Sequence, residues 1–400
     1  MKTDHSLLKL LALSAFCAAP QLGSAAPLVS VGDAADIYFN GYTSLESTSN
    51  VFRDEDDEVD DLVWRLVPGF EVNFGRGASN LDLSLITRYE IRRYAEEDQL
   101  DTELFSIRAQ GTYRSSRLDL SGNLGFSETK TSTGDSNVNL DDLVESDNVN
   151  GALNGEYRFS PKFSFGSGLS YSEREYKAPF DAYFADRETV RIPVDLFYEL
   201  TPKVDLSGGY SYTETSVDAI DGPPQVSSAY DQKSHFFNIG ARGNLLPKLT
   251  GFFKVGYRVS DNDDRTVNIV QTIPGRDDGM LGLDADFTWA ISPKLSAQLG
   301  ASRDFGTGGE GQSTENTSVN MSFDYSINSY FSATAFGSYT NRDYDTDRDD
   351  DQTRLGARLN YTPNEFWSFG GGYTYDENDS SIDGNSYEDH RFDITASLRY

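Results

Sequence analysis

Hydrophobic and polar residues alternate along most of this chain, most regularly in the last eleven residues, His390–Tyr400. Phe392, Ile394, Leu398 and Tyr400 lie on one face of the strand that this period of two predicts, and polar residues occupy most of the other face. A soluble domain rarely ends on such a strand, because its open edge invites pairing with other chains. A barrel closed in a membrane needs such strands, since one face meets lipid and the other meets water.

The same period recurs from Ile37 onward, in segments of roughly ten to fourteen residues, the length with which a tilted strand crosses a bilayer core. In each segment the first, third and later odd positions carry Leu, Val, Phe, Tyr, Ala or Gly, and the positions between them are mostly polar. Clear examples are Leu118–Phe126, Val149–Phe159, Phe163–Tyr171, Val190–Leu200, Val204–Tyr212, Leu281–Ile291, Val319–Ile327 and Leu355–Tyr361.

Very short turns and long polar loops alternate between these strands. Proline presets the φ angle of a tight turn and cannot extend a ladder, and it marks the short turns Ser160–Lys162, Thr201–Lys203, Leu246–Lys248, Ser292–Lys294 and Thr362–Asn364. The long loops include Lys177–Arg187, Asp218–Gln232, Asp261–Gly279 and Gly306–Glu315. This asymmetry is typical of outer-membrane barrels, whose short turns face the periplasm.

We therefore predict an all-β fold, a transmembrane antiparallel up-and-down β-barrel of about eighteen strands with short periplasmic turns and long acidic extracellular loops. Sixteen strands is the alternative, because the first segment, Asp36–Glu46, alternates poorly. Pro68 and Pro193 fall inside strands, so we expect bulges or bends there. Aromatic residues near strand ends, such as Trp64 and Trp289, are expected at the level of the lipid headgroups. A soluble β-sandwich is disfavoured because its strands are shorter.

The N-terminus has the features of a secretory signal peptide. Two lysines flank a short apolar run, Leu7–Ala19, and small residues follow, so we expect cleavage after Ala25. A lipid anchor at Cys17 is disfavoured, because a large residue precedes it. We expect residues 26–400 to form one barrel domain in the outer membrane of a Gram-negative-type cell, with 26–35 as a short periplasmic segment.

Composition excludes several classes of function. The formal net charge of −30 would repel nucleic acid. Aromatic residues make up 13% of the chain and Gly is abundant, as is common in membrane barrels. Cleavage after Ala25 would remove the only cysteine, and His235 and His390 would be the only histidines left, so we expect no metal and no cofactor.

The polar face of the strands would line the barrel interior. The arginines on it are Arg65, Arg88, Arg92, Arg108, Arg158, Arg191, Arg242, Arg258, Arg354, Arg358 and Arg391. The acids on it are Glu71, Asp82, Glu90, Asp119, Glu156, Asp195, Asp284, Asp286 and Asp324. Opposed rings of charge set a transverse field and a size limit in a water-filled pore. The alternative interpretation is that these pairs only neutralise one another in a crowded interior.

Three motifs suggest chemistry but are explained more simply. Gly306–Gly311 has the letters of a dinucleotide-binding motif, but a strand follows it instead of a helix, so we interpret it as a flexible loop tip. Asp343–Asp349 alternates acids like a calcium loop but lacks the glycine and glutamate of an EF-hand, which favours a solvated charge run over a weak divalent-ion site. His235 and His390 have serine neighbours, but nothing marks an oxyanion hole, so we expect no enzyme activity.

Three acidic stretches, Arg53–Asp61, Asp141–Asp147 and Asp376–Asp379, are expected in loops outside the cell. Their simplest role is to keep the loops soluble and extended. The alternative is that divalent cations bridge them to anionic lipopolysaccharide or to a polymer. A dependence of such binding on added cations would distinguish the two.

Four further segments carry a family resemblance: Ser49–Arg53, Trp64–Glu71, Thr87–Tyr89 and Ser386–Arg391. Through them nearly the whole mature chain resembles the β-barrel porin 2 family, outer-membrane proteins often associated with exopolysaccharide gene clusters. The resemblance implies a barrel of this architecture and a part in exporting a cell-surface polysaccharide. It implies no catalytic residues. Because like charge repels a polyanion, export is consistent with a neutral polymer or with a lumen more basic than the loops.

The expected function is passive conduction through an outer-membrane conduit that takes part in polysaccharide export. A general diffusion porin for small hydrophilic solutes is one alternative. A plugged structural or adhesive barrel is the other, because loops such as Asp218–Gln232 and Asp261–Gly279 are long enough to fold inward. The expected partners are outer-membrane lipid and lipopolysaccharide, the barrel-assembly machinery through the C-terminal strand, and a polysaccharide with periplasmic export components.

Overall fold

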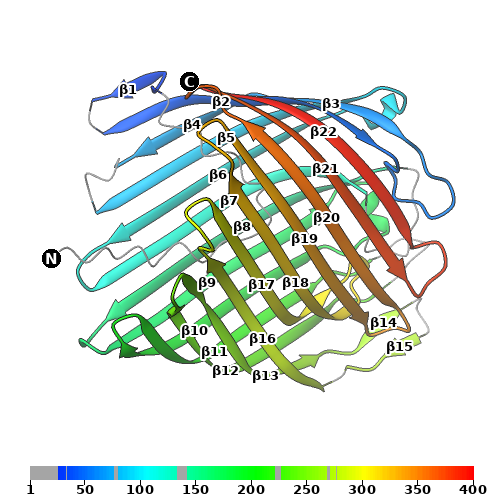
Figure 1. Ribbon diagram of the computed structural model, residues 1–400. Coiled ribbons are helices and arrows are strands. Elements are labelled where there is room, and N and C mark those ends of the chain that lie inside the picture. The colour runs from blue at the N-terminus through cyan, green and yellow to red at the C-terminus, as the bar shows by residue number, and fades with distance from the viewer. Residues whose placement is uncertain are drawn as a thin grey trace.

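The computed structural model describes residues 26–32, 34–75, 80–132, 142–220, 227–267, 271–275 and 277–400. They form a closed antiparallel barrel of eighteen strands, which confirms the predicted fold class and the higher of the two strand counts (Figure 1). Residues 1–25, which contain the expected signal peptide, lie outside the described residues. Among the described residues, no helix has the length and apolar character that a membrane-spanning helix requires.

Each strand of the barrel pairs with the next one along the chain, with β3 and β4 together occupying the place of one strand. The staves of the barrel are β2 (Ala35–Thr48), the interrupted pair β3 (Asp61–Val67) and β4 (Gly69–Phe74), β5 (Leu81–Tyr94), β6 (Thr102–Arg114), β7 (Leu118–Thr131), β8 (Val144–Arg158), β9 (Phe163–Tyr176), β10 (Arg187–Thr201), β11 (Val204–Val217), β12 (Tyr230–Leu246), β13 (Leu249–Asn262), β16 (Asp277–Trp289), β17 (Leu295–Thr307), β18 (Ser313–Ser326), β19 (Phe331–Tyr344), β20 (Asp349–Tyr361), β21 (Trp367–Ser380) and β22 (Tyr387–Arg399).

The barrel closes where the first stave meets the last. β2 pairs with β22 in an unbroken register from Asn40 opposite Arg399 to Thr48 opposite Arg391. The C-terminal residue completes this seam, because the amides and carbonyls of Tyr400 and Phe39 exchange two hydrogen bonds of 2.6 and 2.9 Å. Closure removes both sheet edges, which would otherwise expose unpaired backbone groups to lipid.

The two prolines inside strands have different effects. Pro68 separates β3 from β4, since its nitrogen cannot donate to the ladder, and both segments still pair with β2 and β5. The register with both neighbours continues across Pro68, so no bulge is present there and the ladder is only interrupted. Pro193 lies within β10 opposite Ser211 with no register shift, so no bulge is present there, but the ladder with β9 is interrupted between Arg191 and Val194.

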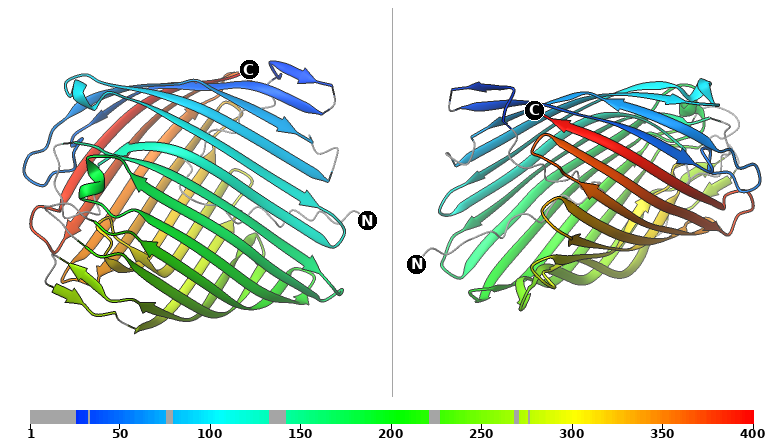
Figure 2. Two further views of the ribbon diagram at one scale, coloured as in Figure 1. Left: turned by 180° about the vertical axis from the view of Figure 1, so that it is seen from behind. Right: turned by 45° about the horizontal axis from the view of Figure 1, so that its top comes forward.

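The ends of the barrel differ as predicted. All five proline turns connect strands at one end, the end that also holds β1 (Val29–Val31), a short strand paired with Ala35–Ile37 of β2. The opposite end carries the longer connections, including the short helical turns η1 (Asp98–Leu100) and η2 (Phe180–Ala182) and the hairpin of β14 (Arg265–Val267) and β15 (Gln271–Ile273) (Figures 1 and 2). Residues 26–35 therefore include a β-strand.

Apolar side chains cover the outside of the cylinder, and the buried apolar clusters lie beneath the long loops. Leu124, Ile239 and Ile394 are among the most exposed, at 61%, 68% and 63%, as expected of residues that face lipid. Three small buried clusters pack at the long-loop end: Val63, Tyr94, Leu100 and Leu143; Val144, Tyr176, Phe180 and Phe184; and Ala185, Val217, Ile220 and Tyr230. These loops are therefore packed structures.

Candidate functional site: a charged lumen beneath folded loops

Side chains alternate strictly between the two faces of each stave, so the exposed apolar residues identify the inward face. The predicted interior residues all lie on the face opposite to these apolar residues: Arg65, Arg88, Arg92, Arg108, Arg158, Arg191, Arg242, Arg258, Arg354, Arg358, Asp195, Asp284, Asp286 and Asp324. In the C-terminal strand, Phe392, Ile394 and Leu398 lie on the outer face. The alternation of polar and apolar residues in the sequence is therefore enough to assign each of these strand residues to the inner or the outer face.

One wall of the barrel, from β8 to β17, carries ion pairs that reach over intervening strands. Arg242 on β12 binds Glu156 on β8 through two hydrogen bonds of 2.7 and 2.8 Å, and it also contacts Asp205 at 3.0 Å. Its guanidinium lies 3.5 Å from the ring centre of Phe197, which adds a cation–π contact. Lys254 on β13 binds both carboxylate oxygens of a residue on β10, Asp195, at 2.8 Å.

The same wall holds a fully buried arginine. Arg258 is 1% exposed, with its guanidinium 3.8 Å from the ring centre of Phe236. It contacts Asp284 at 2.8 Å and Asp304 at 3.0 Å, so two carboxylates balance its charge. Arg191 approaches the same two carboxylates from β10, at 3.6 and 3.9 Å. These contacts fill part of the lumen on this side.

The opposite wall, from β18 through the seam to β7, carries only short-range pairs among the described residues. Arg65 binds Glu46 on the neighbouring strand at 2.8 Å. Arg399 binds Glu71 at 2.9 Å across one intervening strand. Arg88 makes neither an ion pair nor a side-chain hydrogen bond within the described part of the chain. The ion pairs of this wall therefore join side chains that lie no more than two strands apart.

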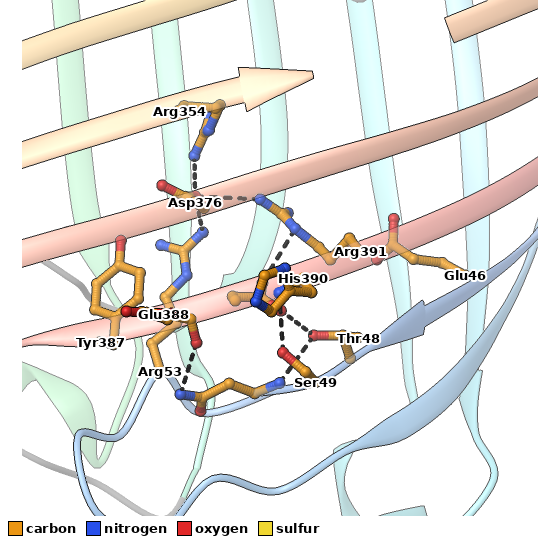
Figure 3. A network of polar contacts seen from close by, with 12 residues as sticks. Glu46, Thr48, Ser49, Arg53, Arg354, Asp376, Tyr387, Glu388, His390 and Arg391 are labelled. Carbon is orange, nitrogen blue, oxygen red and sulfur yellow. Dashed lines mark hydrogen bonds and ion pairs between the residues drawn. The ribbon is translucent and has the colours of Figure 1, made fainter. Parts of the chain in front are cut away.

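Three arginines of this wall converge on one aspartate (Figure 3). Asp376 on β21 is fully buried, and its Oδ2 accepts hydrogen bonds from Arg354 at 2.5 Å, Arg391 at 3.1 Å and Arg53 at 3.1 Å. The side chains of the arginines remain 38%, 25% and 18% exposed in the same order. A second carboxylate, Asp389, contacts Nε of Arg391 at 3.1 Å. We call these five residues the arginine cluster.

The loop between β17 and β18 reaches the ends of β10 and β12, and residues 308–312 of it are buried. Arg187 on β10 donates hydrogen bonds to the carbonyls of Thr307 and Gly308, and the amide of Ala185 donates to Gly309 at 3.1 Å. The hydroxyl of Tyr230 and a guanidinium nitrogen of Arg265 both donate to the carbonyl of Gly311, at 2.7 and 2.6 Å. We call this segment, 308–312, the inward loop.

Charged groups of neighbouring loops surround the inward loop. Arg265 also pairs with Asp345 at 3.3 Å, and burial raises the pKa of this carboxyl although the guanidinium offsets part of the increase. Burial likewise raises the pKa of Asp186, whose carboxylate accepts the amide hydrogen of Tyr176 at 2.7 Å. Protonation of these two groups therefore depends on whether the loops stay packed.

Several sequence interpretations are wrong in the structure. Gly306–Gly311 is not a flexible loop tip, because Gly306 lies in β17 and the residues after Thr307 are buried against other loops. Asp376–Asp379 is not a loop but part of β21, and Asp141–Asp147 lies largely in β8, with its first residue outside the described residues. Both stretches belong to strand ends.

The histidines and two of the aspartates of 343–349 contact neighbouring polar or charged side chains. His235 and His390 lie on the outer face, each within 2.8 Å of a tyrosine hydroxyl, Tyr210 and Tyr373 respectively. In the aspartate run, Asp345 pairs with Arg265, and Asp349 accepts a hydrogen bond from an asparagine. No group of three or more potential metal-ligating side chains is present in the described residues.

Sequence reasoning missed the residues that act through tertiary contacts. Asp376 was assigned to a loop, and the inward loop has no signal in the alternation pattern. Arg187, Tyr230 and Arg265 also were not singled out, because their partners lie 46 to 121 positions away in the chain. The one available signal was the cluster of glycines after Phe305, which permits close approach to another backbone.

The family described as "Putative beta-barrel porin 2" matches residues 42–400. No curated protein matches the chain. Among solved structures, the outer-membrane protein OpdK from Pseudomonas aeruginosa is 10% identical, with 91% of this chain and 99% of that chain covered and a TM-score of 0.46. The ferric-catecholate import receptor Fiu from E. coli K12 is 9% identical, with 90% and 81% covered and a TM-score of 0.46. Likeness at this level carries no argument about function.

Proposed function

The chain belongs to the β-barrel porin 2 family, and from this premise we propose that it is a narrow outer-membrane conduit for hydrophilic solutes, gated by its inward loop. The observation that carries the proposal is the inward loop itself, held by donors from β10, β12 and β14. The mechanism is passive conduction and needs no catalytic group. We also propose that the mature protein begins after a cleaved signal peptide.

The geometry favours a gated conduit over a permanently open porin. The cross-wall ion pairs of Arg242 and Lys254 narrow the lumen on one side, and the inward loop covers the mouth above the same side. Hydrogen bonds to a charged donor stabilise a closed loop by about 1.5–3 kcal/mol each, which is small enough for thermal or ligand-driven opening. A closed state that opens in this way predicts small, intermittent currents.

Export of a cell-surface polysaccharide is the more specific form of this proposal. An exporter has to hold its mouth closed while no polymer is present, and a loop pinned by a few hydrogen bonds meets that requirement. A general diffusion porin remains the second candidate, since the inward face of the wall from β18 to β7 carries mostly polar side chains, as a water-filled pore requires. A steady open-channel current with ready permeation of small sugars would favour the diffusion porin.

A reversible lock on the inward loop tests the gating. A Cβ built on Gly311 would lie 3.4 Å from the Cβ of Ala185, close to the separation of about 3.5–4.5 Å in disulfides. We expect the double variant Ala185→Cys, Gly311→Cys to conduct poorly in planar bilayers when oxidised and to open on reduction. The two single-cysteine variants are the controls and should not respond to the reductant. Equal currents in the oxidised and reduced double variant would refute the gate.

The partners follow from the same proposal. The lipid-facing residues Phe392 and Ile394, with the terminal Tyr400, form the strand that we propose the barrel-assembly machinery recognises. The outer surface would contact outer-membrane lipid and lipopolysaccharide. Periplasmic export components would deliver the polysaccharide to the end of the barrel that carries the short turns.

A further inference from the structure

We propose that Arg354 and Arg391 form a subsite for a carboxylate-bearing solute, and that Asp376 and Asp389 are the positioning residues that hold the two guanidinium groups toward the lumen. This inference rests on the proposed conduit and adds the class of solute. It concerns the wall of the barrel from β18 through the seam to β7, whereas the inward loop contacts β10, β12 and β14.

The first step of the argument is the arrangement of charge and burial in the arginine cluster. Within the arginine cluster three arginines contact two carboxylates, so its cations outnumber its anions in a chain whose net charge is −30; Glu46, which lies near Arg391, is paired with Arg65 at 2.8 Å. Asp376 is fully buried behind the arginines, which remain partly exposed. An incoming solute therefore meets guanidinium groups and not the carboxylate that holds them.

The second step is the number of unused donors. A guanidinium has five N–H donors. Arg354 makes one hydrogen bond within the described residues, from Nη2 to Asp376, and Nη1 has no partner there. Arg391 donates one hydrogen bond, from Nη2 to Asp376; its Nε lies 3.1 Å from Asp389 as an ion pair, and Nη1 has no partner among the described residues. The geometry thus supplies donors on two strands, β20 and β22, that face the same carboxylate between them.

The third step is preorganisation. A planar guanidinium recognises a carboxylate best when its direction is fixed, because less side-chain entropy is lost on binding. Gln352 donates to the other oxygen of Asp376 at 3.3 Å, and Thr48 donates to Asp389 at 2.8 Å, so both positioning carboxylates are themselves held in place. The arginines therefore keep one orientation before the solute arrives.

Ion selectivity provides the first measurement. In a KCl gradient across a planar bilayer, we expect Arg354→Gln and Arg391→Gln each to lower the permeability ratio of chloride to potassium severalfold, and Arg354→Lys to retain most of it. The matched control is Arg303→Gln, because Arg303 pairs with Glu315 on the outer face and carries the same charge. An unchanged ratio in both glutamine variants, or an equal shift in the control, would overturn the subsite.

Current block by a defined solute provides the second measurement. We expect trigalacturonate to block wild-type current at a lower concentration than maltotriose, which has no carboxylate. Loss of one charge-assisted hydrogen bond in Arg354→Gln should raise the blocking concentration of trigalacturonate roughly tenfold and leave that of maltotriose unchanged. Equal block by both sugars in the wild type would refute the assignment even though the barrel conducts. Absence of any current in the reduced double-cysteine variant would instead refute the conduit itself.

Discussion

Replacing Gly311 by valine should push the inward loop out of the mouth of the barrel. Gly311 has a φ of +78°, and a Cβ at this position would lie 2.9 Å from Cγ1 of Val217 and 3.4 Å from the Cβ of Ala185. A residue with a side chain adopts this left-handed backbone conformation only at a cost of about 1–2 kcal/mol. Forcing extra atoms into a packed cluster costs about 1–3 kcal/mol more.

These two contributions together disfavour the closed loop by about 2–5 kcal/mol. Since 1.4 kcal/mol is a factor of ten in an equilibrium constant, the open population should rise at least thirtyfold if closed and open states exchange freely. Single-channel recording in planar bilayers would show this increase as long open periods in place of brief openings. A shift between folded and unfolded bands on unheated gels would show whether the barrel itself remains intact.

A second glycine separates gating from general backbone strain. Gly384, between β21 and β22, has a similar φ of +86°, but no atom lies within 4 Å of a Cβ built there. Gly384→Val therefore carries the backbone cost without the clash, and it should leave the open probability at the wild-type value. If Gly311→Val and Gly384→Val behave alike in a folded barrel, contact between the inward loop and the cluster around Val217 does not control conduction.

Other changes test separate parts of the structure. Arg187→Ala removes two hydrogen bonds to the inward loop, a loss of about 3 kcal/mol or more, and should raise its open probability roughly a hundredfold or more in the same recordings. Arg242→Ala leaves Glu156 without its cation, so the reversal potential in a KCl gradient should shift toward potassium selectivity. The pKa of Asp345 is raised when the loops are packed, so the closed loop is favoured at a pH below the ordinary pKa of an aspartate and loses this advantage as the pH rises through the raised pKa. Closed periods should therefore lengthen on acidification, and they should lengthen less in Asp345→Asn. Deleting Tyr400 removes two hydrogen bonds of the seam and should lower the yield of folded barrel on gels.

Much of the transmembrane part of this fold can be predicted from sequence because it depends on local geometry. Alternation assigns each residue to one face, so the inward side of Arg258 or Asp195 follows from the exposed apolar residues next to it. The count of eighteen strands follows from the turns between them. Pairing partners inside the lumen, such as Glu156 for Arg242, depend on the curvature of the whole barrel and have no local signal.

Sequence reasoning failed where strands continue beyond the bilayer. Near the long-loop end of β21 both faces of the strand contact water. Glu377 and Asp379 therefore stand on the outer face in place of apolar residues, while Asp376 still points inward. The alternation in hydrophobicity disappears there although the strand continues. A run of acids at the end of a membrane strand can thus combine one inward residue with outward ones. This is why the key residue of the arginine cluster was interpreted as part of a loop.

The position of the acids also removes the objection that so acidic a chain would repel an anionic solute. Glu377 lies directly opposite Glu388, and Glu173 opposite Glu188, on the outer face of the strands. These carboxylates point away from the lumen, and at physiological salt their field decays over a Debye length of about 8 Å. A solute in the lumen would meet instead donors such as Nη1 of Arg354, at hydrogen-bonding distance. The charge that selects the solute is therefore that of the inward wall, whatever the net charge of the chain.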